Sequence, residues 1–169
     1  MSYEAIQAAI YAQINEEYEM VRFTQMAWMR KVAERELSRR GDASRRTEST
    51  NYEFRLEYSG AAFLCRWFRI QFVKRGSKTI RVIKSIAIPK DGQYKRAQFK
   101  HAEEWELSMI EQIEEVVSKH RVSVKLLMKA HQSLLSAAKS CGEKLDTIQI
   151  KDRVEPLTTS IKGYKEKLS

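Results

Sequence analysis

Residues 52–88 read YEFRLEYSGAAFLCRWFRIQFVKRGSKTIRVIKSIAI, and their pattern is that of three antiparallel strands. Apolar and charged side chains alternate from Tyr52 to Tyr58, which is the period of a half-buried strand. A Ser59-Gly60 turn signal follows, and then two runs rich in β-branched and aromatic residues, 63–73 and 79–88. We therefore expect a β-meander within residues 51–89, ended by Pro89 and the loop 90–93.

The register of the second hairpin decides which side chains share a face, because a slip of one residue exchanges the two faces. A connection with an odd number of residues and Gly76 at a positive φ gives two well-separated faces. One face would carry Phe68, Ile70, Phe72, Ile80, Val82 and Ile86, and the other Trp67, Arg69, Gln71 and Arg81. A two-residue Gly76-Ser77 turn would instead place Arg69 and Lys84 together among apolar residues. We expect the first register because it segregates polar from apolar side chains better.

Helices are expected before and after these strands in the chain, with the long ones packed on one face of the sheet or extending from it as a helical hairpin. Residues 3–40 contain neither Pro nor Gly, and apolar residues recur there at helical spacing, with Ser2 as N-cap and Gly41 as a stop. A polar connector, 41–50, leads into the sheet. A second long helix is predicted over 97–140 and a C-terminal helix over 156–168, starting at Pro156. The chain, 1–169, is thus predicted to be a single α+β domain: a three-stranded antiparallel β-meander packed with two long α-helices and a C-terminal helix.

The second long helix carries a heptad seam that needs a helical partner. One seam position holds Ile110, Val117, Val124, His131 and Ala138, and the other holds Ile113, His120, Leu127 and Leu134. The first helix is the expected partner. A homodimer through the Ile110–Ala138 seam is the alternative, since the seam is long.

Positive charge is concentrated in one quarter of the chain. Residues 61–100 hold eleven Lys and Arg against one acid, Asp91, while the whole chain carries a net charge of +9. A local cationic surface suits a polyanion, although basic strands can also serve only to keep a sheet edge soluble. The candidate nucleic-acid contacts are Trp67, Arg69, Lys74, Arg75, Lys78, Arg81, Lys90, Lys95, Arg96 and Lys100. The arginines and lysines would hold phosphates, and Trp67 would stack or wedge.

Several other classes of protein find little support in the sequence. Two cysteines are too few for a disulfide framework, and the three histidines, at 101, 120 and 131, are too dispersed to hold one metal ion. No hydrophobic run is long enough for a membrane span, so we expect a cytoplasmic protein without membrane attachment. We expect no catalytic residues, metal or cofactor, and place the carboxylates that follow Glu103 mostly on a solvated face. A Mg²⁺-dependent nuclease using the acids between Glu103 and Glu115 is a remaining alternative.

One further pattern resembles a known family. It comprises Trp67-Phe-Arg69, the turn Phe72-Val-Lys-Arg-Gly76-Ser-Lys78, the aromatic residues Tyr94 and Phe99, Ala102, Trp105-Glu106, and a long helix with Arg121 and Leu127. This arrangement, over roughly residues 63–138, resembles MobI, a family of auxiliary mobilization proteins of SXT-type integrative conjugative elements and A/C-type conjugative plasmids. The resemblance implies a factor that acts at the origin of transfer together with a relaxase.

These observations lead to one hypothesis and one rival. We expect a non-enzymatic DNA-binding accessory protein of the relaxosome type, which binds the origin of transfer to initiate conjugative mobilization. The rival is a helical adaptor that recruits another transfer component without binding DNA itself.

Overall fold

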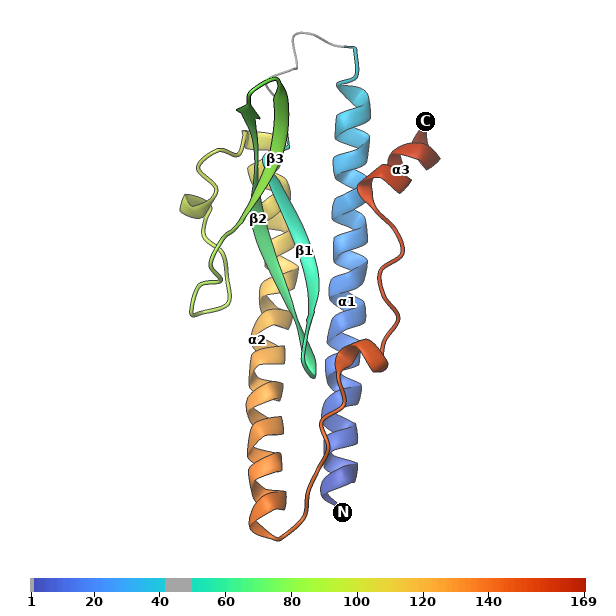
Figure 1. Cartoon of the computed structure of the whole chain (residues 1–169), viewed down its shortest axis with the longest axis vertical. Coiled ribbons are helices and arrows are strands. Elements are labelled where there is room, and N and C mark those ends of the chain that lie inside the picture. Colours follow the sequence, from blue (N-terminus) through green and yellow to red (C-terminus); the bar gives the residue numbers. More distant parts are fainter. Residues whose placement is uncertain (1, 42–49) are drawn as a thin grey trace.

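The computed structural model describes residues 2–41 and 50–169 and has the predicted α+β architecture (Figure 1). In chain order the elements are α1 (Tyr3–Ser38), β1 (Tyr52–Ser59), β2 (Ala62–Arg75), β3 (Lys78–Ser85), the 3₁₀ turn η2 (Arg96–Gln98), α2 (Glu104–Ser140), η3 (Ile150–Asp152) and α3 (Ile161–Leu168). The three strands form one antiparallel sheet in the order β1-β2-β3. The predicted meander is therefore confirmed.

The two long helices lie antiparallel to each other, as Figure 1 shows, although the sheet separates them in the sequence. This pair of helices is called the helical hairpin below. The oxygen Oγ of Ser2 accepts the amide hydrogen of Ala5, so Ser2 is the N-cap of α1 as expected. Polar contacts tie the helices along their length: Tyr11 to His131, Glu17 to His120, and Lys31 to Gln112. Both ends and the middle of the hairpin are thus fixed.

The heptad seam of α2 is filled from within the same chain. Ile110, Val117, Val124, His131 and Ala138 are all buried. The first three share one core with apolar residues of α1 such as Ile14 and Val21, and His131 contacts Tyr11 of α1. The first helix is therefore the partner of the seam. A homodimer through Ile110–Ala138 would have to displace α1 from this core.

The sheet lies against the half of the helical hairpin that contains the end of α1 and the start of α2 (Figure 1). Aromatic rings fill this interface. Trp28 of α1 meets Phe54 and Trp67 edge-on, with ring centroids 6.4 and 6.0 Å apart. Phe99, from the loop before α2, packs edge-on against Tyr52 and Trp67. Side chains distant in sequence therefore build one continuous core.

Three boundaries differ by three residues or more from those predicted. The strand β3 ends at Ser85 rather than at residue 88, and α2 begins at Glu104 rather than at 97, because residues 96–98 form a separate 3₁₀ turn. The C-terminal helix begins at Ile161, where the Oγ of Ser160 accepts the amide hydrogen of Gly163, and not at Pro156. A side-chain N-cap thus fixes the start of α3.

The segment between α2 and α3 runs back along α1 (Figure 1). Ile150 is fully buried and its amide donates to the carbonyl of Gly60 in the β1–β2 turn. The guanidinium of Arg153 lies over the ring of Tyr11 and donates to Asn15 and to the carbonyl of Ala61. This segment joins α1 to the end of the sheet, a contact that the sequence pattern did not predict.

Among the helices that the structure describes, none combines the length and the apolar character needed to cross a membrane.

Candidate nucleic-acid interface

The sheet narrows to a two-stranded ribbon at one end. The strand β1 pairs only with residues 62–69 of β2, whereas β2 and β3 continue alone from the Ile70–Ile83 pair to the Arg75–Lys78 pair. The ribbon therefore projects past β1 toward the end of the molecule where α1 finishes (Figure 1). Within residues 2–41 and 50–169, no third strand pairs with this outer part of the ribbon.

The tip of the ribbon is a two-residue turn, Gly76-Ser77, so the expected register is wrong. Gly76 has a φ of 64°, and no residue other than glycine has a positive φ in the described chain, which is the pattern of a type II′ turn. Phe72 lies opposite Arg81, and Arg69 lies opposite Lys84. The alternative that mixed Arg69 and Lys84 with apolar residues is the one that forms.

On the opposite, outer face of the sheet, arginine side chains cover one of the apolar residues, Phe68. Phe68 lies on the outer face of the sheet but is only 7% exposed. The guanidinium carbons of Arg55 and Arg66 lie 4.6 and 5.0 Å from the centroid of its ring. Such cation–π contacts shield an apolar ring while the charges stay in water.

Trp67 pairs with Phe54 of β1 and lies with it on the buried face of the sheet, so its predicted role as an exposed stacking residue is wrong. Trp67 is fully buried, and its indole Nε1 donates to the carboxylate of Glu114 at 2.9 Å. Arg69 shares this inner face, because residues two apart in a strand point to the same side, and it is half-buried. Neither side chain lies on the open face that the sequence predicted.

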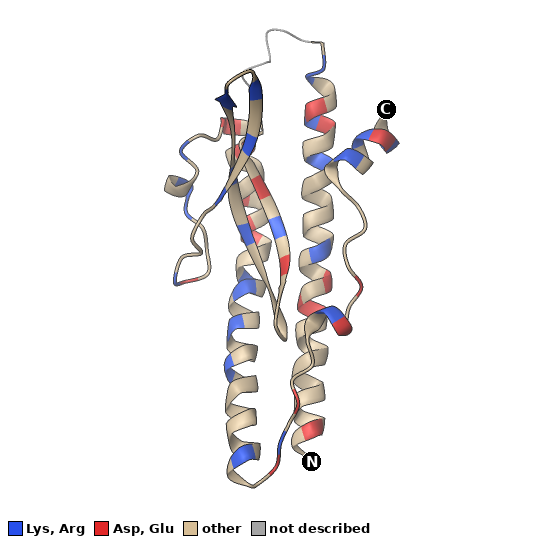
Figure 2. Ribbon diagram, in the orientation of Figure 1, with Lys and Arg blue, Asp and Glu red and all other residues tan. Residues whose placement is uncertain are grey.

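The tip carries the three cations that best fit the prediction. Lys74, Arg75 and Lys78 are exposed, and none of them forms an ion pair with another residue in the described part of the chain. Figure 2 shows basic residues, drawn in blue, at the tip of the ribbon. Phe72 beside them is 66% exposed, an unusual position for a phenylalanine in a monomer. The ribbon thus presents charge together with one bare aromatic ring.

The other predicted cations are less available. Arg81 pairs with Glu53 at 2.9 Å, Lys95 with Asp91 at 2.8 Å, and Arg96 with both Glu104 and Glu111. Lys90 and Lys100 are exposed, but Lys90 lies beside the middle of α2, away from the ribbon tip. The structure therefore divides the predicted basic track into the ribbon tip, three cations paired with acids (Arg81, Lys95 and Arg96) and two exposed lysines (Lys90 and Lys100).

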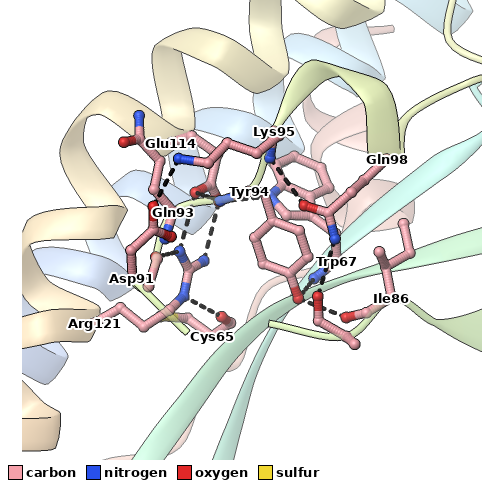
Figure 3. A network of polar contacts seen from close by, with 12 residues as sticks. Cys65, Trp67, Ile86, Asp91, Gln93, Tyr94, Lys95, Gln98, Glu114 and Arg121 are labelled. Atoms are coloured by element: carbon pink, nitrogen blue, oxygen red, sulfur yellow. Dashed lines mark hydrogen bonds and ion pairs between the residues drawn. The ribbon is translucent and has the colours of Figure 1, made fainter. Parts of the chain in front are cut away.

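A buried polar network anchors the base of the ribbon to α2 (Figure 3). The guanidinium of Arg121 forms two hydrogen bonds of 3.0 Å with the carboxylate of Glu114, and it also donates to the backbone carbonyls of Cys65 and Gly92. Glu114 accepts further hydrogen bonds from Trp67 and from the amide of Tyr94. Both members of this ion pair are satisfied, as a buried pair must be.

Burial changes the acidity of the neutral groups near this pair. It raises the pKa of the Cys65 thiol to about 11 and that of the Tyr94 hydroxyl to about 12. Cys65 is therefore an inert packed thiol. The hydroxyl of Tyr94 instead bridges backbone groups, donating to the carbonyl of Ile86 and lying 3.4 Å from the amide nitrogen of Trp67.

A second buried carboxylate fixes the start of the sheet. Glu106 is fully buried and accepts hydrogen bonds from the backbone amides of Asn51 and Tyr52. Burial raises its pKa to about 7. The expectation that the acids after Glu103 lie mostly in solvent is therefore wrong for Glu106 and Glu114. Each is buried and accepts hydrogen bonds from donors elsewhere in the fold. The sequence held one signal for this network: the pattern that resembles MobI includes Trp67, Tyr94, Glu106 and Arg121.

No cluster of three or more His, Cys, Asp or Glu side chains that could bind a metal occurs in residues 2–41 and 50–169. His131 is buried against Tyr11 and its pKa is lowered by burial and by the nearby Arg153. It is a core residue of the helix seam, as the sequence indicated.

The comparisons with known proteins give one family. The family model described as MobI protein matches residues 19–135, which is 117 of the 169 residues and includes the second half of α1 as well as the ribbon and most of α2. The match thus reaches further toward the N-terminus than the pattern in the sequence did. Searches of the curated proteins and of the solved structures find no match. On the family match, this chain belongs to the MobI family of mobilization proteins.

Proposed function

We propose that this mobilization protein binds DNA at the origin of transfer and that the β2–β3 ribbon is its principal contact. The observation that carries the proposal is the ribbon tip, where Lys74, Arg75 and Lys78 stand exposed and without ion pairs among the described residues. In this role the protein acts in the cytoplasm as a non-enzymatic accessory factor and works beside a relaxase.

The shape of the ribbon supports this proposal. The major groove of B-DNA is wide enough to admit a two-stranded β-ribbon. Lysine and arginine side chains on such a ribbon can reach the phosphates on either side, which fixes the position of the protein without reading the sequence. Phe72, 66% exposed, would then contact bases or sugar at the groove edge. Arg81 would join these contacts on leaving Glu53, since an exposed ion pair is worth little.

Salt dependence and site-directed charge removal test the proposal together. The intact protein is titrated, by fluorescence anisotropy, with a duplex that contains the element's origin of transfer, with a scrambled duplex and with the single strands. The same measurement is made on Lys74→Gln/Arg75→Gln/Lys78→Gln. The control is Lys139→Gln/Lys144→Gln/Lys151→Gln, which removes equal charge from exposed positions in α2 and the C-terminal segment.

The ribbon variant should bind at least about tenfold more weakly, and the slope of log affinity against log salt should fall by roughly three units for duplex DNA. The control variant should behave as the wild type. The proposal fails if the wild type shows no salt-sensitive binding to any of these DNAs, or if the two variants weaken binding equally.

A further inference from the structure

A groove of about 580 Å³ lies on the molecule away from the ribbon tip, between α2, the first half of β2 and the loop that follows β3. Its lining is mainly apolar and includes Leu64, Ile88, Pro89, Val122, Leu126 and Met128. The loop stands beside the middle of α2 in Figure 1. The proposed DNA contact does not use this groove.

Three of the lining side chains are more exposed than the core would require. Leu126 is 57% exposed, Leu64 is 40% exposed and Val122 is 39% exposed. Single exposed apolar residues are common on protein surfaces, but these three lie around one hollow. An apolar surface gathered in a groove is typical of a binding site.

The wall of the groove is rigidly held. Arg121, at the base, donates to the carbonyl of Gly92 in the loop and to that of Cys65 in β2. Gly92 packs so closely on α2 that an added Cβ would lie 2.9 Å from a methyl carbon of Val122. These contacts hold the loop in place beside α2.

The rim of the groove is cationic. Lys90, Lys125 and Lys129 line it, and none of them forms an ion pair within the residues that the structure describes. The acid at the rim, Asp91, is already engaged by Lys95 at 2.8 Å. An occupant of this groove should thus combine apolar side chains with carboxylates.

We propose that the groove binds an amphipathic helix of another protein, with apolar side chains on one face and carboxylates beside them. The wall that α2 contributes runs from Arg121 to Lys129, about 13 Å at the rise of an α-helix, which suits a helix of a few turns laid alongside. DNA is the poorer occupant, because phosphates and sugars would leave the apolar floor without partners. This inference does not depend on DNA binding by the ribbon.

Selection from a phage-displayed library of random peptides tests the proposal and requires no candidate partner. Phage are selected on the wild-type protein and depleted on Leu126→Glu, an exposed position where the substitution should leave the fold intact. Peptides that survive should carry apolar residues at helical spacing and net negative charge. Synthetic copies should bind roughly tenfold or more weakly to Leu126→Glu and to Lys90→Gln/Lys125→Gln/Lys129→Gln.

The matched control is Val116→Glu, which places the same charge on another exposed apolar residue of α2, outside the groove. It should bind the peptides as the wild type does, and so should the ribbon variant. The proposal is overturned if no Leu126→Glu-sensitive peptide emerges or if the selected peptides are neutral or basic. It is also overturned if the triple lysine variant loses affinity for DNA instead, or if the wild type forms a dimer that Leu126→Glu abolishes.

Discussion

At the scale of single residues, the most telling side chains are two buried carboxylates that face the sheet from α2. Glu106 holds the backbone amides of Asn51 and Tyr52, and Glu114 holds Arg121, Trp67 and Tyr94. Both replace hydrogen bonds that water would otherwise supply to buried donors. Their partners differ: Glu106 accepts hydrogen bonds from backbone amides, whereas Glu114 also pairs with the guanidinium of Arg121.

The stability of the protein should therefore depend on the ionisation of Glu106. Its folded pKa of about 7 lies above the ordinary value of 4.5, so the folded state holds the proton more tightly. The stabilisation from this group is fully present below pH 4.5 and is lost as the pH rises through 7. Glu106→Gln should lack this loss. Relative to the variant, the wild type should lose on the order of 3 kcal/mol of unfolding free energy as the pH rises from 4.5 to 8.

Urea denaturation of both proteins across this pH range measures the difference, and groups that titrate in both proteins cancel in it. A difference that stays constant with pH would show that the pKa of Glu106 is the same in the folded and the unfolded protein.

The Arg121–Glu114 pair should show the cost of a buried charge left alone. Arg121→Met leaves the carboxylate of Glu114 buried without its cation, and we expect a loss of roughly 3–5 kcal/mol in the free energy of unfolding. The double variant Arg121→Met/Glu114→Gln should recover part of that loss, because Gln keeps an acceptor for Trp67. Arg66→Met is the control: its ion pair with Glu57 is about one-third exposed and should cost about 1 kcal/mol or less. Equal stability of the single and double variants would contradict this account.

At the scale of elements, the loop after β3 depends on a close approach to α2. Gly92 and Gly142 have nearly the same positive φ, 78° and 76°, but only Gly92 has a neighbour in the space of its missing Cβ. Gly142→Ala should cost only the backbone penalty of about 1–2 kcal/mol. Gly92→Ala should cost on the order of 1–3 kcal/mol more, since it also overpacks against Val122.

Thermal or urea unfolding of these two variants gives the comparison, and the double variant Gly92→Ala/Val122→Ala should remove much of the excess cost. If Gly92→Ala and Gly142→Ala are equally stable, the loop is free to move away from α2, and the rigid wall of the groove is lost with it.

At the scale of the whole molecule, the helical hairpin is complete within one chain. The seam of α2 is buried by α1, the sheet covers one part of the hairpin, and the C-terminal segment lies along α1. Without DNA or a peptide partner, light scattering on the purified protein should give the mass of a monomer, 19.8 kDa. A mass twice as large at micromolar concentration would mean that another surface drives dimerisation.

Local sequence was sufficient to specify the elements and the concentration of charge. Helical and strand periods are local, so α1, the three strands and α2 could be predicted from spacing alone, with errors confined to their ends. The excess of cations between residues 61 and 100 is a property of composition and needs no structure. Family membership was also visible, since Trp67, Tyr94, Glu106 and Arg121 were already in the pattern that resembled MobI.

Which of those residues face solvent depends instead on tertiary contacts. The register of the ribbon depends on one residue of turn length. Segregation of polar from apolar side chains predicted the wrong register, because Arg55 and Arg66 cover Phe68 on the outer face. Trp67 packs in the core against Trp28 and Phe54, and Glu114, 47 positions away, accepts its indole hydrogen. Neighbouring acids likewise neutralise Arg81, Lys95 and Arg96, while Lys74, Arg75 and Lys78 remain without ion pairs in the described chain. The burial of a side chain and its ion pairs depend on contacts between residues distant in sequence, and a local sequence pattern does not contain those contacts.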